Sequence, residues 1–266
     1  MAKIIAVTNQ KGGVGKTTTT QHVGIGLANL GYRVLLVDAD PQGSLTASLG
    51  YTEPDRMDIT LANVLARQIN DYDFDKSYGL IHCTEGVDLI PGNIELSALD
   101  MQLVNLLSRE TVLKSYLDHY ADEYDYILID CMPSLGMLTI NAFVAANSIL
   151  IPMQAAYLPT KGLIQLLKTI GKIRNGLNPS LEIEGLVFTM VDERTNFTKD
   201  IETLIKENYG SRMRIFNTRI PFSIRAAEAS AQGISVFIHA PKNPVALAYK
   251  SLIQELLTDT IITTEE

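Results

Sequence analysis

A glycine-rich loop near the N-terminus carries the residues with the clearest chemistry. The stretch Lys3–Thr20 reads KIIAVTNQKGGVGKTTTT, an apolar strand that runs into the loop. A phosphate chain needs backbone N–H groups turned toward it, and Gly12, Gly13 and Gly15 let the backbone take that curve without Cβ clashes. The loop is therefore predicted to bind the phosphates of a nucleotide.

Two side chains at the end of the loop extend this site. Lys16 supplies a positive charge, and Thr17 supplies a hydroxyl that can bind Mg²⁺. The helix that begins here directs the positive end of its dipole at the phosphates. The general phosphate-loop pattern has Gly five residues before Gly15; here that residue is Gln10, and an additional lysine, Lys11, follows it. The predicted phosphate-binding residues are Gly12, Gly13, Val14, Gly15, Lys16, Thr17 and Thr18.

Two further strand-like runs end in acidic residues. Tyr126–Asp130 reads YILID, and Val34–Asp40 reads VLLVDAD. Both would deliver carboxylates to the carboxyl edge of a sheet, where ligands bind in open α/β folds. We predict that Asp130 holds Mg²⁺ through water, and that Asp40 orients the attacking water and lies within reach of the metal. Asp38 is expected to anchor the loop or a metal-bound water, with a pair of turn carboxylates before a proline as the alternative.

The elements that would position these residues follow a regular alternation of apolar runs and helical periodicity. The runs lack period-2 alternation, as expected for parallel strands covered on both faces. This pattern predicts an α/β fold, a doubly wound and mostly parallel sheet in one domain over residues 1–266, with roughly the last eight residues a flexible acidic tail. The expected strands are Ile4–Thr8, Val34–Val37, Tyr126–Ile129, Ile149–Pro152 and Leu186–Met190, with Leu80–Cys83 and Val87–Pro91 as a hairpin or further strands. The expected helices are Thr18–Leu30, Ile94–Tyr120, Leu138–Ala146, Gly162–Asn175, Lys199–Tyr209 and Pro244–Leu257.

Composition restricts the functional classes. A net charge of −8 and a pI near 5.1 argue against a generally basic nucleic-acid binder, so any such binding needs a local patch. Two cysteines without metal-ligand spacing suggest a reducing compartment. The uncharged stretch 131–160 is interrupted by three prolines and by polar residues, which indicates core rather than a membrane span. With no signal peptide before the first strand, we expect a cytoplasmic protein.

Four segments together resemble the ParA/Soj partition ATPases, of the MinD-type group with a deviant phosphate loop (deviant Walker A P-loop). They occur in the family's order between residue 3 and about residue 250: KGGVGKTTTT, VLLVDADPQGSLT, YDYILIDCMPSLGMLTINAF and IPFSIRAAEASAQG. The resemblance implies an ATPase that binds ATP and Mg²⁺, forms a homodimer bridged by two nucleotides, and hydrolyses slowly until a ParB-like partner stimulates it. It also implies catalytic roles for Lys11, which crosses to the partner's phosphates, for Lys16 and for Asp40. Met190 and Pro221 would frame the adenine.

Three departures from the family's pattern flank the expected dimer interface. Met132 replaces a common proline, Ala155-Ala156-Tyr157 replaces a common Cys-Glu-Tyr run, and Lys161 stands where an acidic residue is common. They bear on dimer strength and partner choice more than on nucleotide binding.

The resemblance also implies non-specific DNA binding by the ATP-bound dimer, at the nucleoid, to move a plasmid, chromosome or mobile element. The segment Arg194–Arg225 holds seven basic and three acidic residues, a local charge of +4. Phosphate contacts there would give affinity without sequence specificity. A solvated helix face is the alternative for most of these side chains. The candidate DNA contacts are Arg194, Arg225, Arg219 and Lys199, of which the first and second match DNA-contacting positions of Soj-like proteins.

Two other classes of protein share the nucleotide site. A MinD-like ATPase that binds membranes needs a basic amphipathic tail, whereas this chain ends LLTDTIITTEE. An electron donor resembling the nitrogenase iron protein would share an iron–sulfur cluster among four thiolates of a dimer. Cys83 lies in a strand-like run and Cys131 directly follows Asp130, so we expect both to be buried and unreactive.

Overall fold

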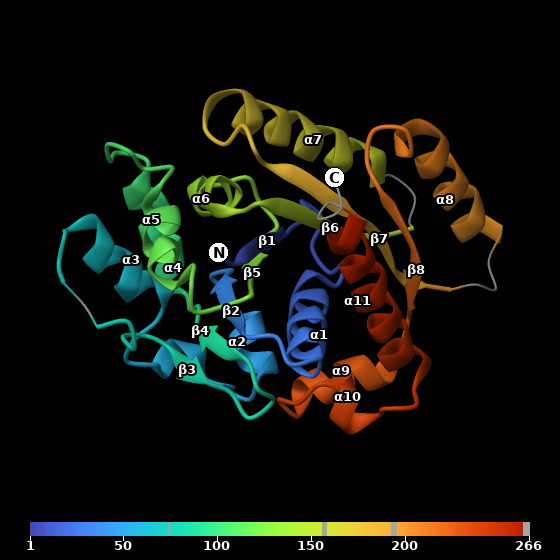
Figure 1. Ribbon diagram of the computed structural model, residues 1–266, viewed down its shortest axis with the longest axis horizontal. Coiled ribbons are helices and arrows are strands. Elements are labelled where there is room, and N and C mark those ends of the chain that lie inside the picture. The colour runs from blue at the N-terminus through green and yellow to red at the C-terminus, as the bar shows by residue number, and fades with distance from the viewer. Residues whose placement is uncertain (74, 156–158, 193–195, 263–266) are drawn as a thin grey trace.

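The strands form one sheet at the centre of the molecule. The computed structural model describes residues 1–73, 75–155, 159–192 and 196–262. Within them, eight strands lie in the order β3-β4-β2-β5-β1-β6-β7-β8, and every neighbouring pair is parallel except β3 and β4 (Figure 1). The strands are β1 (Lys3–Val7), β2 (Val34–Ala39), β3 (Ile81–His82), β4 (Asp88–Ile90), β5 (Tyr126–Cys131), β6 (Ser148–Gln154), β7 (Glu182–Val191) and β8 (Ile215–Pro221).

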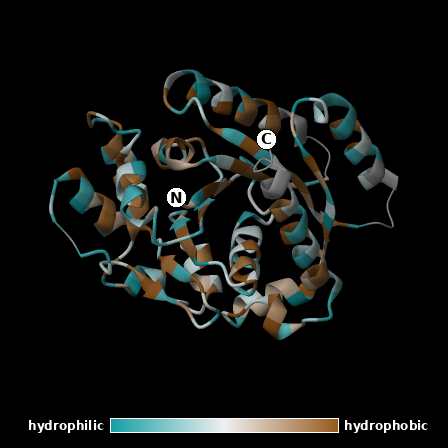
Figure 2. Cartoon of the chain, in the orientation of Figure 1, coloured by the Kyte–Doolittle hydropathy of each residue, from teal (hydrophilic) through white to brown (hydrophobic). Residues whose placement is uncertain are grey.

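Helices cover both faces of this sheet, so the fold has three layers. The core on one face packs the sheet against α3 to α8, and the core on the other face packs it against α1, α2 and α9 to α11. The strands between them are largely apolar (Figure 2), because both of their faces are buried. The helices are α1 (Lys16–Ala28), α2 (Ser44–Ser48), α3 (Leu61–Ile69), α4 (Glu95–Leu103), α5 (Val112–Leu117), α6 (Met137–Ala145), α7 (Pro159–Gly176), α8 (Asn196–Tyr209), α9 (Ile224–Ala231), α10 (Val236–His239) and α11 (Pro244–Ile262), with short 3-10 turns at Pro54–Arg56 and Asp118–Tyr120.

The predicted α/β class and the mostly parallel sheet are confirmed. The two short runs around residue 85 pair with each other as the hairpin β3–β4, and β4 also joins β2 as a parallel strand. The uncharged stretch forms α6 and β6 in the core. Among the described residues, no helix is long and apolar enough to cross a membrane.

One strand (β8) and four helices (α2, α3, α9 and α10) were not among the expected elements, and two expected helices have other bounds. β8 lies at the edge of the sheet, and its buried residues alternate with exposed ones, so it has no continuous apolar run. The expected helix Ile94–Tyr120 is wrong as one element: it divides into α4 and α5, and Ser108 between them has a φ of +53° that a helix does not allow. α11 extends to Ile262, into the expected tail, because no Gly or Pro ends it.

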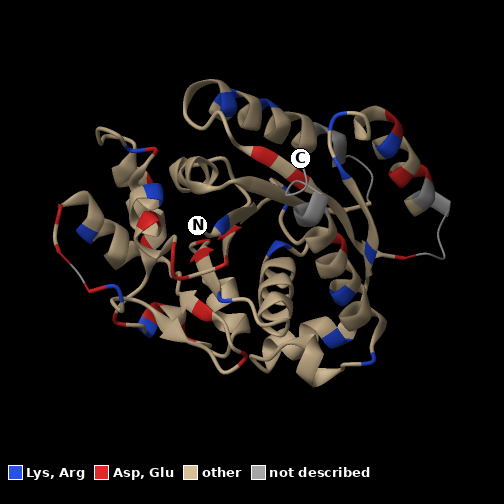
Figure 3. Ribbon diagram, viewed as in Figure 1, with Lys and Arg blue, Asp and Glu red and all other residues tan. Residues whose placement is uncertain are grey.

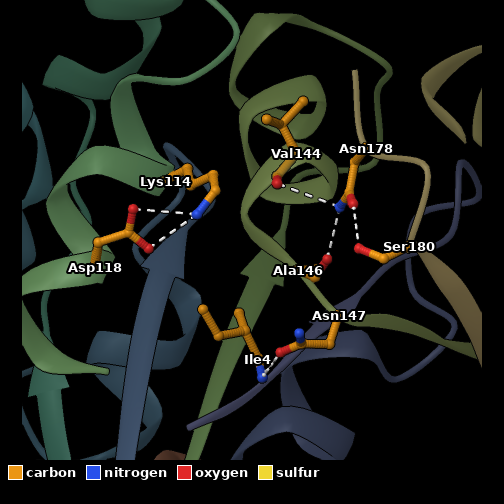
Figure 4. Close-up of polar contacts among 8 residues, drawn as sticks. All are labelled: Ile4, Lys114, Asp118, Val144, Ala146, Asn147, Asn178 and Ser180. Carbon is orange, nitrogen blue, oxygen red and sulfur yellow. Dashed lines mark hydrogen bonds and ion pairs between the residues drawn. The ribbon is translucent and has the colours of Figure 1, made fainter. Parts of the chain in front are cut away.

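A set of hydrogen bonds fixes β1 beside the end of α6 (Figure 4). Asn178 Nδ2 donates to the carbonyl oxygens of Val144 and Ala146, at 3.3 and 2.8 Å. Asn147 Oδ1 accepts from the Ile4 N–H at 2.7 Å. Asn178 thus satisfies carbonyl groups at the end of α6, and Asn147, which follows α6, holds the backbone of β1, the strand that leads into the glycine-rich loop.

Candidate functional site

The glycine-rich loop connects β1 to α1 at the carboxyl edge of the sheet. Gly13 and Gly15 have φ angles of +69° and +81°, which favour glycine, and Gly15 is the residue before α1. A Cβ on Gly12 or Gly13 would meet no atom within 4 Å, so the space beside these glycines is open. Asn9 braces the loop, because its Oδ1 accepts from the Lys11 N–H at 3.1 Å and its Nδ2 donates to Pro152 O at 2.8 Å.

The first turn of α1 meets the end of β5. Thr17 Oγ1 donates to Asp130 Oδ2 at 2.7 Å, and Thr20 Oγ1 lies 3.4 Å from the other carboxylate oxygen. Lys16 is buried beside them, and its charge lowers the pKa of Asp130 as a minor effect. The structure thus brings together the hydroxyl, the lysine and the carboxylate that the sequence singled out.

The carboxylates at this edge crowd one another. Asp38 and Asp130 are paired in the register of β2 and β5, and both are fully buried. Burial raises the pKa of Asp130 to about 8, with the charge of Asp38 adding to the effect. Burial likewise raises the pKa of Asp38 to about 6, against three hydrogen bonds that lower it. A divalent cation would offset this excess of negative charge.

The donor set fits Mg²⁺ that also takes phosphate oxygens as ligands. No group of three or more His, Cys, Asp or Glu residues in the described part of the chain could hold a metal by itself. Mg²⁺ in nucleotide sites usually has one or two protein oxygens, with water and phosphate completing the octahedron. Thr17 and Asp130 supply such oxygens next to the open glycine loop.

Asp38 and Asp40 have different surroundings. Asp38 accepts three hydrogen bonds, all from the residues that follow it: Thr46 N–H and Oγ1 at 2.8 and 2.7 Å, and Asp40 N–H at 3.3 Å. Asp40 keeps 8% of its surface exposed, and its Oδ1 accepts from Gln42 N–H at 3.0 Å. The Asp40 charge raises the pKa of both Asp38 and Asp130 slightly, so it lies near them. This geometry favours loop anchoring for Asp38 and leaves Asp40 to face a ligand.

A cavity of about 150 Å³ adjoins the glycine loop on its α9 side. It is lined by Gly15 of the loop, by Thr18 of α1, and by both residues expected to frame the adenine, Met190 and Pro221. Met190 has a φ of +52°, an uncommon conformation for a side chain that is not glycine. The remaining lining residues are Thr189, Ile220, Phe222, Ser223, Ala226, Ala227, Ser230, Val245 and Tyr249.

The sequence analysis did not find the α9 side of this cavity. Ala226, Ala227 and Ser230 lie in the family segment IPFSIRAAEASAQG, but they are small residues whose types do not indicate a contact with a ligand. α9 also packs against α2, and the turns that follow the two helices lie close together: a Cβ on Gly233 would lie 2.4 Å from the Gly50 Cα. One short helix therefore contacts the cavity and the segment that follows Asp40.

Lys11 projects outward from the loop. Its side chain is exposed, and Nζ lies 3.4 Å from Gln154 Oε1 at the end of β6. Of the departures from the family pattern, Met132 and Ala155 are half-buried. Ala156 and Tyr157 lie outside the described residues, as does the Lys161 side chain.

The predicted DNA contacts are distributed over β8, α8 and α9. Arg225 Nη1 donates to Glu228 Oε2 at 2.8 Å, and His239 Nε2 lies 3.2 Å from the same oxygen. Arg219 pairs with Glu202 at 2.6 Å. Basic residues recur along β8 and on the helices around α9 and α11, with acidic residues among them (Figure 3). Arg194 lies outside the described residues, and Lys199 is on α8 but its side chain is not described.

Neither cysteine has the surroundings of a metal-binding thiolate. Cys131 is buried in β5, and burial raises the pKa of its thiol. Cys83 is half-buried, and burial raises its pKa to about 11. Both thiols therefore stay protonated near neutral pH, which disfavours cluster ligation in this state.

The chain is similar to several known proteins. Residues 2–183 match the AAA domain family. The chain is 41% identical to the sporulation initiation inhibitor protein Soj of Bacillus subtilis, over 96% of this chain and 98% of the relative. It is 36% identical to the chromosome partitioning protein ParA of Caulobacter vibrioides, over 96% and 94%. A crystal structure of cobyrinic acid a,c-diamide synthase from Mycobacterium smegmatis, with bound ATP analogue and magnesium, superposes with a TM-score of 0.84 at 35% identity, over 97% and 95%.

Proposed function

The chain belongs to the ParA/Soj family of partition ATPases, and from this premise we propose that it is a nucleotide-switched DNA clamp. In the proposed cycle the protein binds ATP and Mg²⁺ and closes into a homodimer. The dimer binds DNA of any sequence at the nucleoid and releases it after hydrolysis. A ParB-like partner stimulates the slow ATPase, and the cycle positions a plasmid, chromosome or mobile element.

The observation that supports nucleotide binding is the contact between α1 and β5. Thr17 and Asp130 meet within 2.7 Å beside an open glycine loop. The apolar cavity next to that loop, which Met190 and Pro221 line, suits an adenine base. Phosphates on the loop, a cation at Thr17 and a base in the cavity would follow one continuous path.

Each residue at this edge has a separate task in the proposed hydrolysis. The backbone N–H groups of the loop and Lys16 hold the phosphates and stabilise the charge of the transition state. Mg²⁺, when bound, neutralises charge on the phosphate oxygens, with Thr17 and Asp130 on its protein side. Asp40 orients the attacking water and Asp38 holds the loop that carries Asp40.

The dimer supplies the remaining positive charge. Lys11 is exposed, and the family resemblance places it on the phosphates of the partner subunit. There it would act as an arginine finger does, an effect worth about 10³-fold or more in rate.

DNA binding in this proposal depends on the surface around α9. The segment Arg194–Arg225, which leads into α9, has a local charge of +4 although the whole chain carries −8. Dimerisation would double that local charge, and phosphate contacts alone give affinity without sequence preference. Arg225 is the residue on which we base the test, because it is 58% exposed on α9.

The test measures binding of duplex DNA of arbitrary sequence with ADP, with ATP, and with ATP in Asp40→Ala. We expect binding with ATP, little with ADP, and undiminished binding in the variant, which should hold ATP without hydrolysing it. In Arg225→Ala the salt slope of binding should flatten by about one unit for each lost phosphate contact. The matched control is Arg56→Ala, since Arg56 also pairs with a glutamate three residues away, at 2.9 Å, but outside the patch.

Two results would contradict the proposal at different levels. A slope unchanged in Arg225→Ala would remove Arg225 from the interface. No DNA binding in any nucleotide state, with ATP-dependent dimerisation intact, would refute the clamp. Sedimentation with anionic liposomes would then test the membrane-binding alternative.

A further inference from the structure

Thr46, on α2, links three parts of the carboxyl edge. Its N–H and its Oγ1 both donate to Asp38 Oδ2, at 2.8 and 2.7 Å, and the Gly92 N–H donates to the same hydroxyl at 3.0 Å. Thr46 is fully buried. Its hydroxyl is therefore a donor to the carboxylate of β2 and an acceptor from the segment after β4, and only a residue with a hydroxyl can do both at this position.

The segment between Asp38 and Thr46 is short and closed. Asp38 Oδ1 accepts from the Asp40 N–H at 3.3 Å, and the Asp40 carbonyl accepts from the Gly43 N–H at 2.9 Å. Gly43 has a φ of +59° and precedes the first residue of α2. The position of Asp40 thus depends on one turn that is tied at both ends to the Asp38 carboxylate.

Gly92 limits how this segment can move. A Cβ on Gly92 would lie 2.4 Å from the Asp38 carbonyl oxygen and 3.0 Å from its Cγ. The backbone after β4 therefore lies directly against Asp38, and the Thr46 hydroxyl joins the two. Losing that hydroxyl would leave the Gly92 N–H and Asp38 Oδ2 with one hydrogen bond fewer each, beside side chains that are fully buried.

We infer that Thr46 is a positioning residue for ATP hydrolysis, which acts through Asp38 to hold Asp40 where it can orient the attacking water. The inference rests on the proposed ATPase cycle. It assigns no contact between Thr46 and the nucleotide. Small displacements of a positioned group cost up to about a hundredfold in rate, so the effect should appear in kcat more than in ATP affinity.

The first test compares Thr46→Ala, Thr46→Ser and a control in steady-state ATP hydrolysis. Thr46→Ala should lower kcat by about tenfold to a hundredfold while KM for ATP changes by less than about threefold. Thr46→Ser keeps the hydroxyl and should retain kcat. The control is Ser48→Ala: Ser48 is also buried on α2, but its hydroxyl donates to Leu45 O within the helix at 2.8 Å and does not touch Asp38.

A double-mutant cycle separates positioning from loss of stability. The cycle uses the residual hydrolysis of Asp40→Ala, followed in single-turnover experiments over long times. In that background Thr46→Ala should not lower the residual rate further, because the group it positions is absent. Additive losses would overturn the inference, as would wild-type kcat in Thr46→Ala or an equal loss in Ser48→Ala. If Thr46→Ala does not fold, Thr46→Ser decides: the inference fails if the serine variant folds but loses kcat like Asp40→Ala.

The same experiment distinguishes this inference from the proposed function. If the wild-type protein hydrolyses no ATP, or if Asp40→Ala hydrolyses it at the wild-type rate, the proposed function itself fails. If both behave as proposed and Thr46→Ala matches the wild type, the assignment of Thr46 alone is wrong.

Discussion

Glu228 forms an ion pair with Arg225, the residue proposed to contact DNA. Its Oε2 accepts from Arg225 and lies within 3.2 Å of His239 Nε2. The hydrogen bonds from His239 and Arg225 lower the pKa of this carboxyl, so it stays charged near neutral pH. A DNA phosphate that binds Arg225 must therefore displace the Glu228 carboxylate.

We expect Glu228→Gln to tighten DNA binding by about twofold to fivefold at low salt, because an exposed ion pair of this kind contributes little and the variant frees Arg225. The measurement is a titration of duplex DNA with ATP-bound protein at several salt concentrations. Glu53→Gln is the control, since it removes the same charge from an exposed glutamate that pairs with Arg56 at 2.9 Å, outside the segment Arg194–Arg225. Equal tightening in both variants would show a general effect of net charge.

At the scale of elements, His22 connects α1 to the C-terminal helices. Its Nδ1 lies 2.7 Å from Thr18 O, and its Nε2 accepts from the Val236 N–H at the start of α10. Its ring stacks on Tyr249 of α11, with centroids 4.9 Å apart. A neutral imidazole satisfies both contacts, because its Nδ1–H can donate to Thr18 O while its Nε2 accepts from the Val236 N–H. Burial lowers the pKa of His22 to about 4, against the opposing hydrogen bond to Thr18.

Folding should therefore become less favourable as the pH falls from about 6.5 to about 4, because the unfolded chain binds a proton there that the folded one excludes. The full effect of His22 is about 3 kcal/mol of unfolding free energy, reached below pH 4. Urea denaturation at several pH values checks this in the wild type and in His22→Gln, which cannot titrate. The variant should lose less stability over this range. Parallel curves would mean that His22 is not protonated on unfolding.

The elements also show what sequence patterns can and cannot predict. The glycine loop was predictable because Gly13, Gly15 and Lys16 lie within four consecutive residues and phosphate binding requires residues of these types. Asp130 and Asp40 were predictable because strand ends meet at one edge. β8 was not, since an edge strand with exposed alternate residues lacks an apolar run.

The cavity and the ion pairs depend on tertiary packing. The cavity combines residues 15 to 18 with residues 189 to 249, and most of its lining is small or apolar side chains whose types alone do not indicate a ligand. Thr46 is the last residue of the family segment VLLVDADPQGSLT. The contact of its hydroxyl with Gly92 nevertheless depends on the pairing of β4 with β2, which the segment does not indicate. Such contacts follow from the fold and not from spacing.

At the scale of the whole molecule, the proposed dimer should depend on Lys11. We expect Lys11→Ala to bind ATP but to stay monomeric, because the exposed lysine would no longer reach the partner's phosphates. Light scattering with Mg·ATP in the Asp40→Ala background measures this without hydrolysis. Lys114→Ala is the control, since Lys114 is an exposed lysine on α5 whose partner, Asp118 at 3.0 Å, directly follows that helix. A dimer in Lys11→Ala would contradict the crossing role.

α9 lies at the meeting point of the two proposed ligands. It lines the cavity with Ala226, Ala227 and Ser230, and it carries Arg225 on its outer surface. At equilibrium, any coupling between two binding sites has the same free energy in both directions. If ATP strengthens the hold on DNA through this helix, then DNA must strengthen the hold on ATP by the same factor. A chromosome would then be an effector of the nucleotide site as well as a track.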